Sequence, residues 1–289
     1  MHAAIITAFK DPDMLARLAD ALLGRGFKLF IHVDRRSRFD PELLDDLVRR
    51  GCVVDRRYRI VWGGYTHLLA ITDLMRRALR DPAVDYVHTL SGQDYPIKDR
   101  SYFDQVCDGR AFISWEPLAE TPEEVRDRFD QYKLLYPVEW WRSIPGPIER
   151  PLRRLQRIFG IRRKGTRDFN RSAIFKGLVW LSLPADVARH AVESPAAHRL
   201  LRDLRFSYLP EEFFFQTMIA NSPFSDRVAH DDLRYMDWGP RDGVRPAVLD
   251  ARDEDALARS PALFARKFDS RRSAELLQAL SAAESAAAA

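Results

Sequence analysis

Apolar residues near the start of the chain form two short runs with a helical stripe between them. The runs HAAIITAF (2–9) and KLFIHVD (28–34) predict buried strands. Met14, Leu18 and Leu22 lie between them at helical spacing, and GRG follows where a helix would end. A strand, a helix and a strand joined by short links predict a βαβ unit with parallel strands. The chain therefore begins as an α/β protein.

The same alternation continues to about residue 100. PELLDDLVRRG (41–51) and THLLAITDLMRRALR (66–80) predict helices, and CVVD (52–55) and DYVHTLSG (85–92) predict strands. We expect residues 1–100 to form the nucleotide-binding half of a central, mostly parallel sheet flanked by helices. Ligands of such sheets bind beyond the carboxyl ends of the strands. In this chain those ends carry HVDRRS, WGGYTH and LSGQDYP.

The second half is less regular. Residues 121–166 are charged, aromatic and interrupted by proline, which predicts helices and loops laid over the sheet. AIFKGLVWLSL (173–183) predicts a strand, and PADVARHAV and AAHRLLRDL predict helices. With no internal repeat or clear linker, we expect one domain over 1–272. The alanine-rich residues 273–289 predict a helical tail.

Composition adds few constraints. Of the 289 residues, 46% are hydrophobic and 30% are charged, which is ordinary for a globular protein. Cys52 and Cys107 are too few for a disulfide framework or a cysteine-rich metal site. The N-terminus lacks the features of a signal peptide, and no apolar run approaches the roughly 20 residues of a membrane-spanning helix. We therefore expect a cytoplasmic protein.

The net charge of +4 is concentrated in one segment. Residues 150–167 contain eight basic residues, from Arg150 to Arg167, and no acidic one, while Leu152, Leu155 and Phe159 follow helical spacing. One interpretation is a solvated helix whose apolar stripe faces the core. The other is a basic amphipathic helix that contacts an anionic membrane, here the inner membrane surface, or a polyanion. Nothing indicates a nucleic-acid partner.

Most common cofactor motifs are absent from the sequence. It has no glycine-rich phosphate loop, no H-E-x-x-H and no cysteine-pair metal site. DPD (11–13) fits an Asp-x-Asp metal pattern, but it opens a predicted helix, where aspartate is a common N-terminal cap.

Several candidate residues have two interpretations each. His32, Val33 and Asp34 end one strand and Asp94 ends another, so they could hold a base or ribose, or simply cap the strand and form a turn. Arg266 and Lys267 are adjacent cations that could neutralise a diphosphate, or be surface charge.

The stretch SYLPEEFFFQTMIANSP (207–223) poses the sharpest question. Glu211 and Glu212 precede three phenylalanines. Both could be first-turn carboxylates that interact with a helix dipole. Alternatively, one of them could be held in a poorly solvated position for chemistry.

The order of seven segments resembles one enzyme family. HVDRRS, VWGGYTHLLAITDLMRRAL, LSGQDYPIKD, KGLVWLSL, YLPEEFFFQTMIANSP, LRYMDW and SPALFARKFD occur in this order. Together they resemble the core-2/I-branching β-1,6-N-acetylglucosaminyltransferases and the related peptide O-xylosyltransferases. The resemblance extends to about Asp269 and is least clear over 120–171. WGG, ARKF and the acid before FFQT favour the xylosyltransferase side.

The resemblance implies a fold, a reaction and a set of site residues, with 1–100 as the UDP-binding half and 101–272 as the acceptor and catalytic half. It implies a glycosyltransferase-A-type fold and an inverting, metal-independent transfer of N-acetylglucosamine or xylose from a UDP-sugar to a hydroxyl of a glycan, a lipid-linked oligosaccharide or a peptide. No metal cofactor is expected. Glu212 corresponds to the general base, and Glu211 then keeps its solvated, non-catalytic interpretation. The remaining positions are, for the leaving group, Arg266, Lys267 and Arg245; for the uridine, His32, Val33, Asp34 and Asp94; and for the acceptor, Glu116, Trp180 and Trp238.

Two alternatives stay open. The fold could be kept with a metal-dependent site that uses Asp34 or Asp94 as a ligand. The chain could also be a non-catalytic module that binds a membrane surface or a polyanion through residues 150–167.

Overall fold

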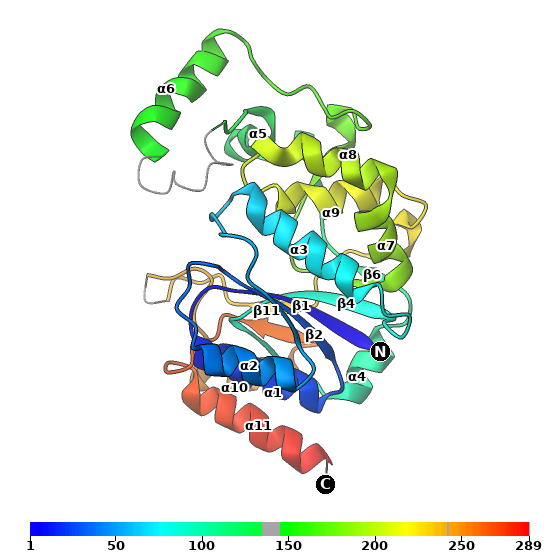
Figure 1. The fold of residues 1–289 in the computed structure, drawn as a ribbon, viewed down its shortest axis with the longest axis vertical. Coiled ribbons are helices and arrows are strands. Elements are labelled where there is room, and N and C mark those ends of the chain that lie inside the picture. Colours follow the sequence, from blue (N-terminus) through cyan, green and yellow to red (C-terminus); the bar gives the residue numbers. More distant parts are fainter. Residues whose placement is uncertain (135–144, 242, 289) are drawn as a thin grey trace.

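The computed structural model describes residues 1–134, 145–241 and 243–288, and its centre is a seven-stranded sheet with helices on both faces (Figure 1). The strands lie in the order β10, β6, β9, β4, β1, β2, β3. All pairs are parallel except those of β9, which runs antiparallel to β4 and β6. The bounds are β1 His2–Ala8, β2 Lys28–Val33, β3 Val53–Asp55, β4 Tyr86–Ser91, β6 Ala111–Phe112, β9 Ser182–Pro184 and β10 Val228–Ala229. The predicted α/β class with a mostly parallel central sheet is confirmed.

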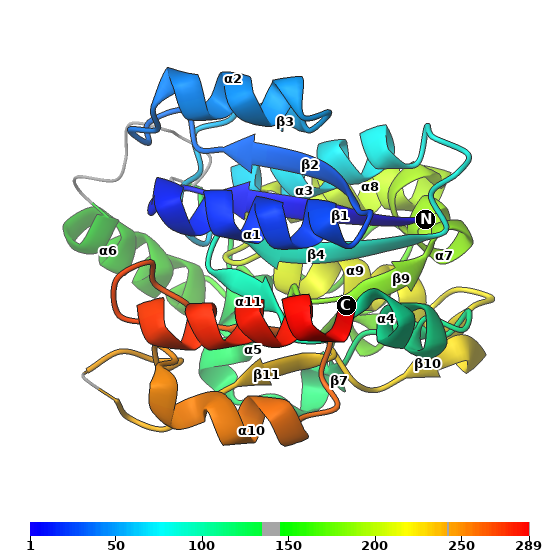
Figure 2. The same ribbon diagram turned by 90° about the horizontal axis from the view of Figure 1, so that it is seen from below.

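Successive residues of β1 contribute side chains to two separate cores, because side chains alternate between the faces of a strand. Ala3 and Ile5 pack with one set of helices, and Ala4 and Ile6 with the other. The first set is α3 (Tyr65–Ala78), α7 (Ala185–Glu193), α8 (Pro195–Asp203) and α9 (Glu211–Ala220). The second is α1 (Pro12–Gly24), α2 (Pro41–Arg49) and α4 (Arg100–Val106), seen in front of the sheet in Figure 2.

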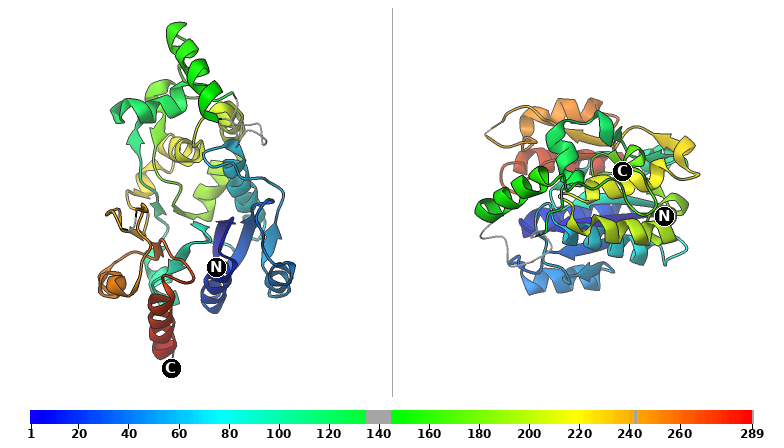
Figure 3. Two further views of the ribbon diagram at one scale, coloured as in Figure 1. Left: turned by 90° about the vertical axis from the view of Figure 1, so that its left-hand side faces the viewer. Right: turned by 90° about the horizontal axis from the view of Figure 1, so that it is seen from above.

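Two small sheets extend the central one. β11 (Arg234–Met236), β12 (Phe264–Arg266) and β5 (Asp94–Pro96) form the first, and β7 (Glu116–Pro117) pairs with β8 (Phe175–Lys176) in the second. Beyond β7 lie α5 (Glu123–Asp130) and α6 (Pro145–Ile158). Figure 3 shows an elongated molecule with α6 at one end and α11 (Ala274–Ala288) at the other; α10 (Glu254–Arg259) lies near α11.

The predicted strand over 173–183 is wrong in its middle. The structure has two short strands, β8 and β9, and the residues between them are not paired in a sheet. The physical reason is close packing at Gly177, where an added Cβ would lie 2.0 Å from the carbonyl oxygen of Ser114. This approach turns the chain away from a regular ladder and directs it across the carboxyl edge of the sheet.

Two further segments are clarified by the structure. Asp11 caps α1, since its side chain accepts a hydrogen bond from the Met14 N–H, so DPD begins a helix as expected. The predicted tail is helical, but Leu276 and Leu277 are buried in a core with Met14, so its first turns pack on the domain.

The apolar stripe of the basic segment does not face the core. Leu155 is 46% exposed and Phe159 is 69% exposed, so the interpretation of a core-facing stripe is wrong. The side chain of Arg150 lies outside the described part. No helix in the described ranges combines the length and apolar character needed to cross a membrane.

Candidate active site

The strand register brings several predicted site residues to one edge of the sheet. Thr7, near the carboxyl end of β1, is paired with His32 on one side and with Ser91 on the other. Asp34 follows directly, and its backbone N–H donates to the carbonyl of Ala8 at 2.8 Å. This edge is where α/β sheets bind their ligands.

Asp94 and Arg266 form a buried ion pair at this edge. They are directly opposite each other on β5 and β12, and Nη1 of Arg266 donates to Oδ1 of Asp94 at 2.9 Å. The same nitrogen lies 3.1 Å from the hydroxyl of Ser91, whose backbone N–H donates to Asp94. Burial raises the pKa of Asp94, and the charge of Arg266 opposes that rise. The two residues hold each other in place between the strands.

The guanidinium of Arg266 also lies against Trp180. Its central carbon is 4.1 Å from the centre of the indole ring, within the range of a cation–π contact. This contact places a residue predicted for the acceptor next to one predicted for the leaving group.

Lys267 adds a second positive charge beside Arg266. Burial lowers the pKa of Lys267, and the neighbouring charges of Lys10 and Arg266 lower it further. Lys10 follows β1 at the same edge of the sheet. Three cations gathered in this way repel one another, and a bound anion such as a diphosphate would relieve that repulsion.

Three of the residues predicted for uridine, His32, Val33 and Asp34, are buried around the end of β2. Val33 is fully buried in the core, and Asp34 accepts hydrogen bonds from the backbone N–H and the guanidinium of Arg36. Nε2 of His32 accepts the N–H of Tyr58, and burial lowers the pKa of His32 to about 4. The neutral ring therefore carries its proton on Nδ1, which is buried without a hydrogen-bond partner among the described residues.

Glu212 lies in the first turn of α9 with two cations near it. Its Oε2 accepts a hydrogen bond from Nη1 of Arg128 on α5 at 2.9 Å, and its side chain is 16% exposed. Burial raises the pKa of Glu212, while the charges of Lys176 and Arg128 oppose the rise. Lys176 lies 3.8 Å from Glu116, so these four charged groups form one acceptor-side cluster.

A single segment connects this cluster to the cations. The N–H of Gly177 donates to the backbone carbonyl of Glu212 at 2.9 Å. Trp180, three positions along the chain, covers Arg266. Between them the carbonyl of Val179 accepts from the hydroxyl of Thr89 on β4. The segment thus fixes the base candidate and the leaving-group candidate to the same sheet.

The interpretation of Glu211 as a solvated first-turn residue is wrong. It is 4% exposed, which is more deeply buried than its neighbour, and its Oε1 lies 2.9 Å from Nδ1 of His67. Nε2 of His67 lies 3.2 Å from the hydroxyl of Thr7. The N-terminus of α9 packs against the N-terminus of α3, and this contact removes Glu211 from solvent. Glu211 connects α9 to the edge of the sheet.

Three predicted residues lie at the periphery. Trp238 is 54% exposed, and Arg245 is exposed in the loop after β11. Among the described residues, Arg245 makes no hydrogen bond or ion pair. Glu116 is the outermost member of the charged cluster, since its side chain is 50% exposed and contacts Lys176.

Sequence reasoning missed three side chains that the structure brings into the site. Arg128 lies in the region where the resemblance is least clear, and Lys176 and His67 lie within the motifs KGLVWLSL and WGGYTH. The available signal for Lys176 and His67 was their place within two of the seven ordered segments, whereas no local pattern marked Arg128. The exposed Trp62 packs edge-on against Tyr208, whose ring lies 6.0 Å from the guanidinium of Arg128.

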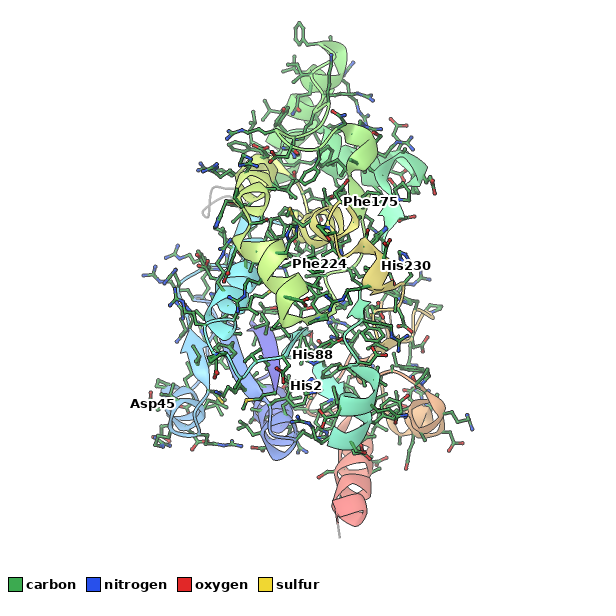
Figure 4. All side chains as sticks on the ribbon, turned by 90° about the vertical axis from the view of Figure 1, so that its right-hand side faces the viewer. His2, Asp45, His88, Phe175, Phe224 and His230 are labelled. Carbon is green, nitrogen blue, oxygen red and sulfur yellow. The ribbon has the colours of Figure 1, made fainter. Side chains whose placement is uncertain are left out.

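One group of described residues could offer three metal ligands, but it lies at the opposite edge. His2, His88 and Cys107 have their ligand atoms within 4.8 Å of one another, near the start of β1 (Figure 4). A hydrogen-bond chain from Ser182 through His88 and His2 to Asp104 already engages every nitrogen of both rings. The buried cation Arg234 also acts on His88 and Cys107, which opposes a further positive charge. We interpret the group as a structural hydrogen-bond chain.

Comparison with known proteins gives the following matches. The sequence profile of the Core-2/I-Branching enzyme family matches residues 5–256. Xylosyltransferase sqv-6 of Caenorhabditis elegans is 24% identical over 271 residues, which are 83% of this chain and 31% of the relative. Xylosyltransferase 2 of Canis lupus familiaris is 25% identical over 296 residues, which are 92% of this chain and 31% of the relative. This chain therefore spans less than a third of the length of these two curated relatives.

Among solved structures, S. aureus TarS 1-349 overlaps with a TM-score of 0.27 and 10% identity, covering 39% of this chain and 35% of that one. An overlap of this size does not bear on the fold, which rests on the sheet described above.

Proposed function

Because the chain belongs to the Core-2/I-branching enzyme family, as its seven ordered motifs predict, we propose that it is a glycosyltransferase. The substrates we propose are a UDP-sugar, carrying N-acetylglucosamine or xylose, and an acceptor hydroxyl on a glycan, a lipid-linked oligosaccharide or a peptide. The observation that carries the proposal is the segment from Gly177 to Trp180, which holds the Glu212 backbone at one end and Arg266 at the other. A base and a leaving-group cation on a common support suit an in-line displacement.

The proposed reaction is a single displacement with inversion at the anomeric carbon. The acceptor oxygen attacks that carbon as Glu212 takes its proton, and the bond to the UDP oxygen breaks with its electron pair leaving on UDP. A general base must be within hydrogen-bond reach of the proton it removes. Glu212 has one oxygen held by Arg128, which leaves the other carboxylate oxygen for the acceptor.

The charge environment of Glu212 suits this role. Burial raises its pKa and so makes the ionised carboxylate a stronger base. The charges of Arg128 and Lys176 oppose this rise, because they favour the ionised carboxylate. These opposing effects make the rise in the pKa of Glu212 smaller than burial alone would cause.

The leaving UDP develops negative charge that fixed cations can stabilise. Arg266 and Lys267 are the proposed cations, with Lys10 beside them. Arg266 is already oriented by Asp94, Ser91 and Trp180, so little reorganisation is needed as the bond breaks. The carboxylates of Asp34 and Asp94 are each engaged by an arginine, which favours a metal-independent site over the metal-dependent alternative.

The test is a UDP-release assay of the purified chain with a panel of UDP-sugars, with and without EDTA. We expect release with UDP-N-acetylglucosamine or UDP-xylose, unchanged by EDTA. Glu212→Gln should lower turnover by about 10²–10⁴-fold, the usual contribution of a general base, and leave UDP affinity unchanged.

Glu193→Gln, an exposed glutamate on α7, is the matched control and should keep full activity. Near-normal turnover of Glu212→Gln would show that the base is misassigned. Loss of activity in EDTA, restored by a divalent cation, would instead support the metal-dependent alternative. No release with any donor would contradict the proposal as a whole.

A further inference from the structure

Helix α6 is attached to the domain by its polar side chains. The amide of Gln156 makes two hydrogen bonds with the backbone of Tyr132, each at 2.9 Å. Arg153 donates to the side chain of Gln131, and Arg157 pairs with the buried Asp127 at 2.5 Å. Residues 153, 156 and 157 share one helix face, and that polar face is the one turned toward the protein.

Four apolar residues of the same segment consequently face outward, while Leu152 is half-buried. Leu155, Ile158, Phe159 and Ile161 are between 46% and 69% exposed. Four large apolar side chains exposed within seven residues differ from the single exposed residues found on any soluble surface. Their orientation is the reverse of the usual amphipathic helix, which turns its apolar face inward.

Three cations border these apolar residues. Arg154, Arg162 and Lys164 are exposed, and none forms an ion pair with a carboxylate in the described ranges. Most other arginines of this region are occupied, for example Arg167 by Asp203 and Arg171 by Asp130. The combination of exposed apolar groups and unpaired cations matches the chemistry of an anionic lipid surface, which receives both.

The turn that follows α6 is held in a defined position. Arg163 is buried, with its guanidinium 4.9 Å from the ring of Phe129 and 5.0 Å from that of Tyr132. It also donates to the hydroxyl of Ser207. The neighbouring Arg162 and Lys164 are exposed on either side of this anchored residue. Helix α6, which precedes them, lies at the end of the molecule opposite α11 (Figure 1).

We infer that the surface formed by residues 154–164 docks on an anionic lipid bilayer and brings a membrane-bound acceptor to the site, an inference that for the acceptor rests on the proposed function. The route is short. Asp127, which binds Arg157 of α6, is adjacent on α5 to Arg128, which binds Glu212. A bilayer that meets α6 is thus connected through α5 to the proposed base, and a lipid-linked oligosaccharide is the acceptor class that suits this connection.

The experiment is co-sedimentation of the full chain with phosphatidylcholine vesicles, with and without phosphatidylglycerol. We expect binding only with phosphatidylglycerol, weakened by added salt. Ile158→Ser/Phe159→Ser and, separately, Arg154→Ser/Arg162→Ser/Lys164→Ser should each lower binding at least about tenfold. Val48→Ser, which removes an exposed apolar side chain from α2, should bind as the unmodified chain does.

The outcomes separate this inference from the proposed function. Glu212→Gln should still bind vesicles, because docking does not need the base. Absence of binding to phosphatidylglycerol vesicles, or equal binding by the Ile158→Ser/Phe159→Ser variant, would overturn the docking surface while leaving UDP release in solution unaffected. Thermal unfolding of each variant checks that lost binding does not reflect lost structure.

Discussion

Two carboxylate–arginine pairs in this molecule have the same separation and different surroundings. Asp94 with Arg266 and Glu212 with Arg128 each show a nitrogen–oxygen distance of 2.9 Å. The first pair lies between strands, with side chains 0% and 13% exposed; the second joins two helices, with side chains 16% and 30% exposed. Equal geometry therefore does not mean equal function.

The surroundings decide which pair can open. Separating Asp94 from Arg266 would leave a charge without compensation in the interior, which is costly. Arg128 can move toward solvent while Glu212 retains the charge of Lys176 nearby. We interpret the buried pair as a fixed part of the donor side, and the partly exposed pair as one that adjusts when an acceptor binds.

The same substitution in both pairs gives the sharpest contrast, and its largest effect is expected at Arg266. Arg266→Met should destabilise the fold by about 3–5 kcal/mol at pH 7, because Asp94 remains buried without its partner. Since burial raises the pKa of Asp94 and Arg266 opposes this, the variant's Asp94 protonates more readily. The loss of unfolding free energy in Arg266→Met should therefore become smaller as the pH falls toward 4. Denaturant unfolding at both pH values measures this.

Arg199→Met, which breaks a more exposed pair with Asp168, is the control and should change stability little. If Arg266→Met loses no more unfolding free energy than this control, the Asp94–Arg266 pair is not the structural pair that we infer, and its distinction from the Glu212–Arg128 pair fails.

Substitution of Glu211 should change stability by an amount between those expected at Arg266 and Arg128. Glu211→Ala should cost about 1–3 kcal/mol of unfolding free energy, because the partly buried ring of His67 loses its partner. Glu211→Gln keeps an acceptor oxygen for His67 and should retain turnover within about tenfold. Comparing both variants with Glu212→Gln in the UDP-release assay tests the asymmetry between the neighbours. Equal loss of turnover in Glu211→Gln and Glu212→Gln would contradict it.

The smallest change in stability is expected at Arg128. Arg128→Met should cost less than about 1 kcal/mol, because the pair is partly exposed. Its effect should instead appear in the pH profile of kcat/KM. Removing a cation that lowers the pKa of Glu212 raises that pKa, so the acidic limb should move to higher pH. If the Arg128→Met variant is stably folded and its pH profile of kcat/KM is unchanged, the pair does not control the pKa of Glu212.

The sequence predicted the elements whose signals are local. Strands β1, β2 and β4 and helices α1 and α3 follow from apolar periodicity within single segments, and the structure agrees with them to within about two residues. The order of motifs also predicted the family. Both kinds of information are present in the linear chain without knowledge of its packing.

Features that depend on distant contacts were not predictable. The burial of Glu211 depends on His67, 144 positions away, and the environment of Glu212 on Arg128, 84 positions away. The direction of the stripe in α6 depends on which residues find polar partners on α5 and after it. A period-3.6 pattern shows that a helix has two faces, but the partners decide which one is turned inward.

Gly177 has a consequence for how this sequence can vary. It contributes no charge and no side chain, yet an added methyl group would meet the carbonyl of Ser114 at 2.0 Å and displace the N–H that holds the Glu212 backbone. Conservation at such a position would reflect the room available to the backbone and not any chemistry of its own. Evolution could replace the peripheral Trp238 or Arg245 one step at a time, whereas a change at residue 177 would require a simultaneous change in the loop that carries Ser114.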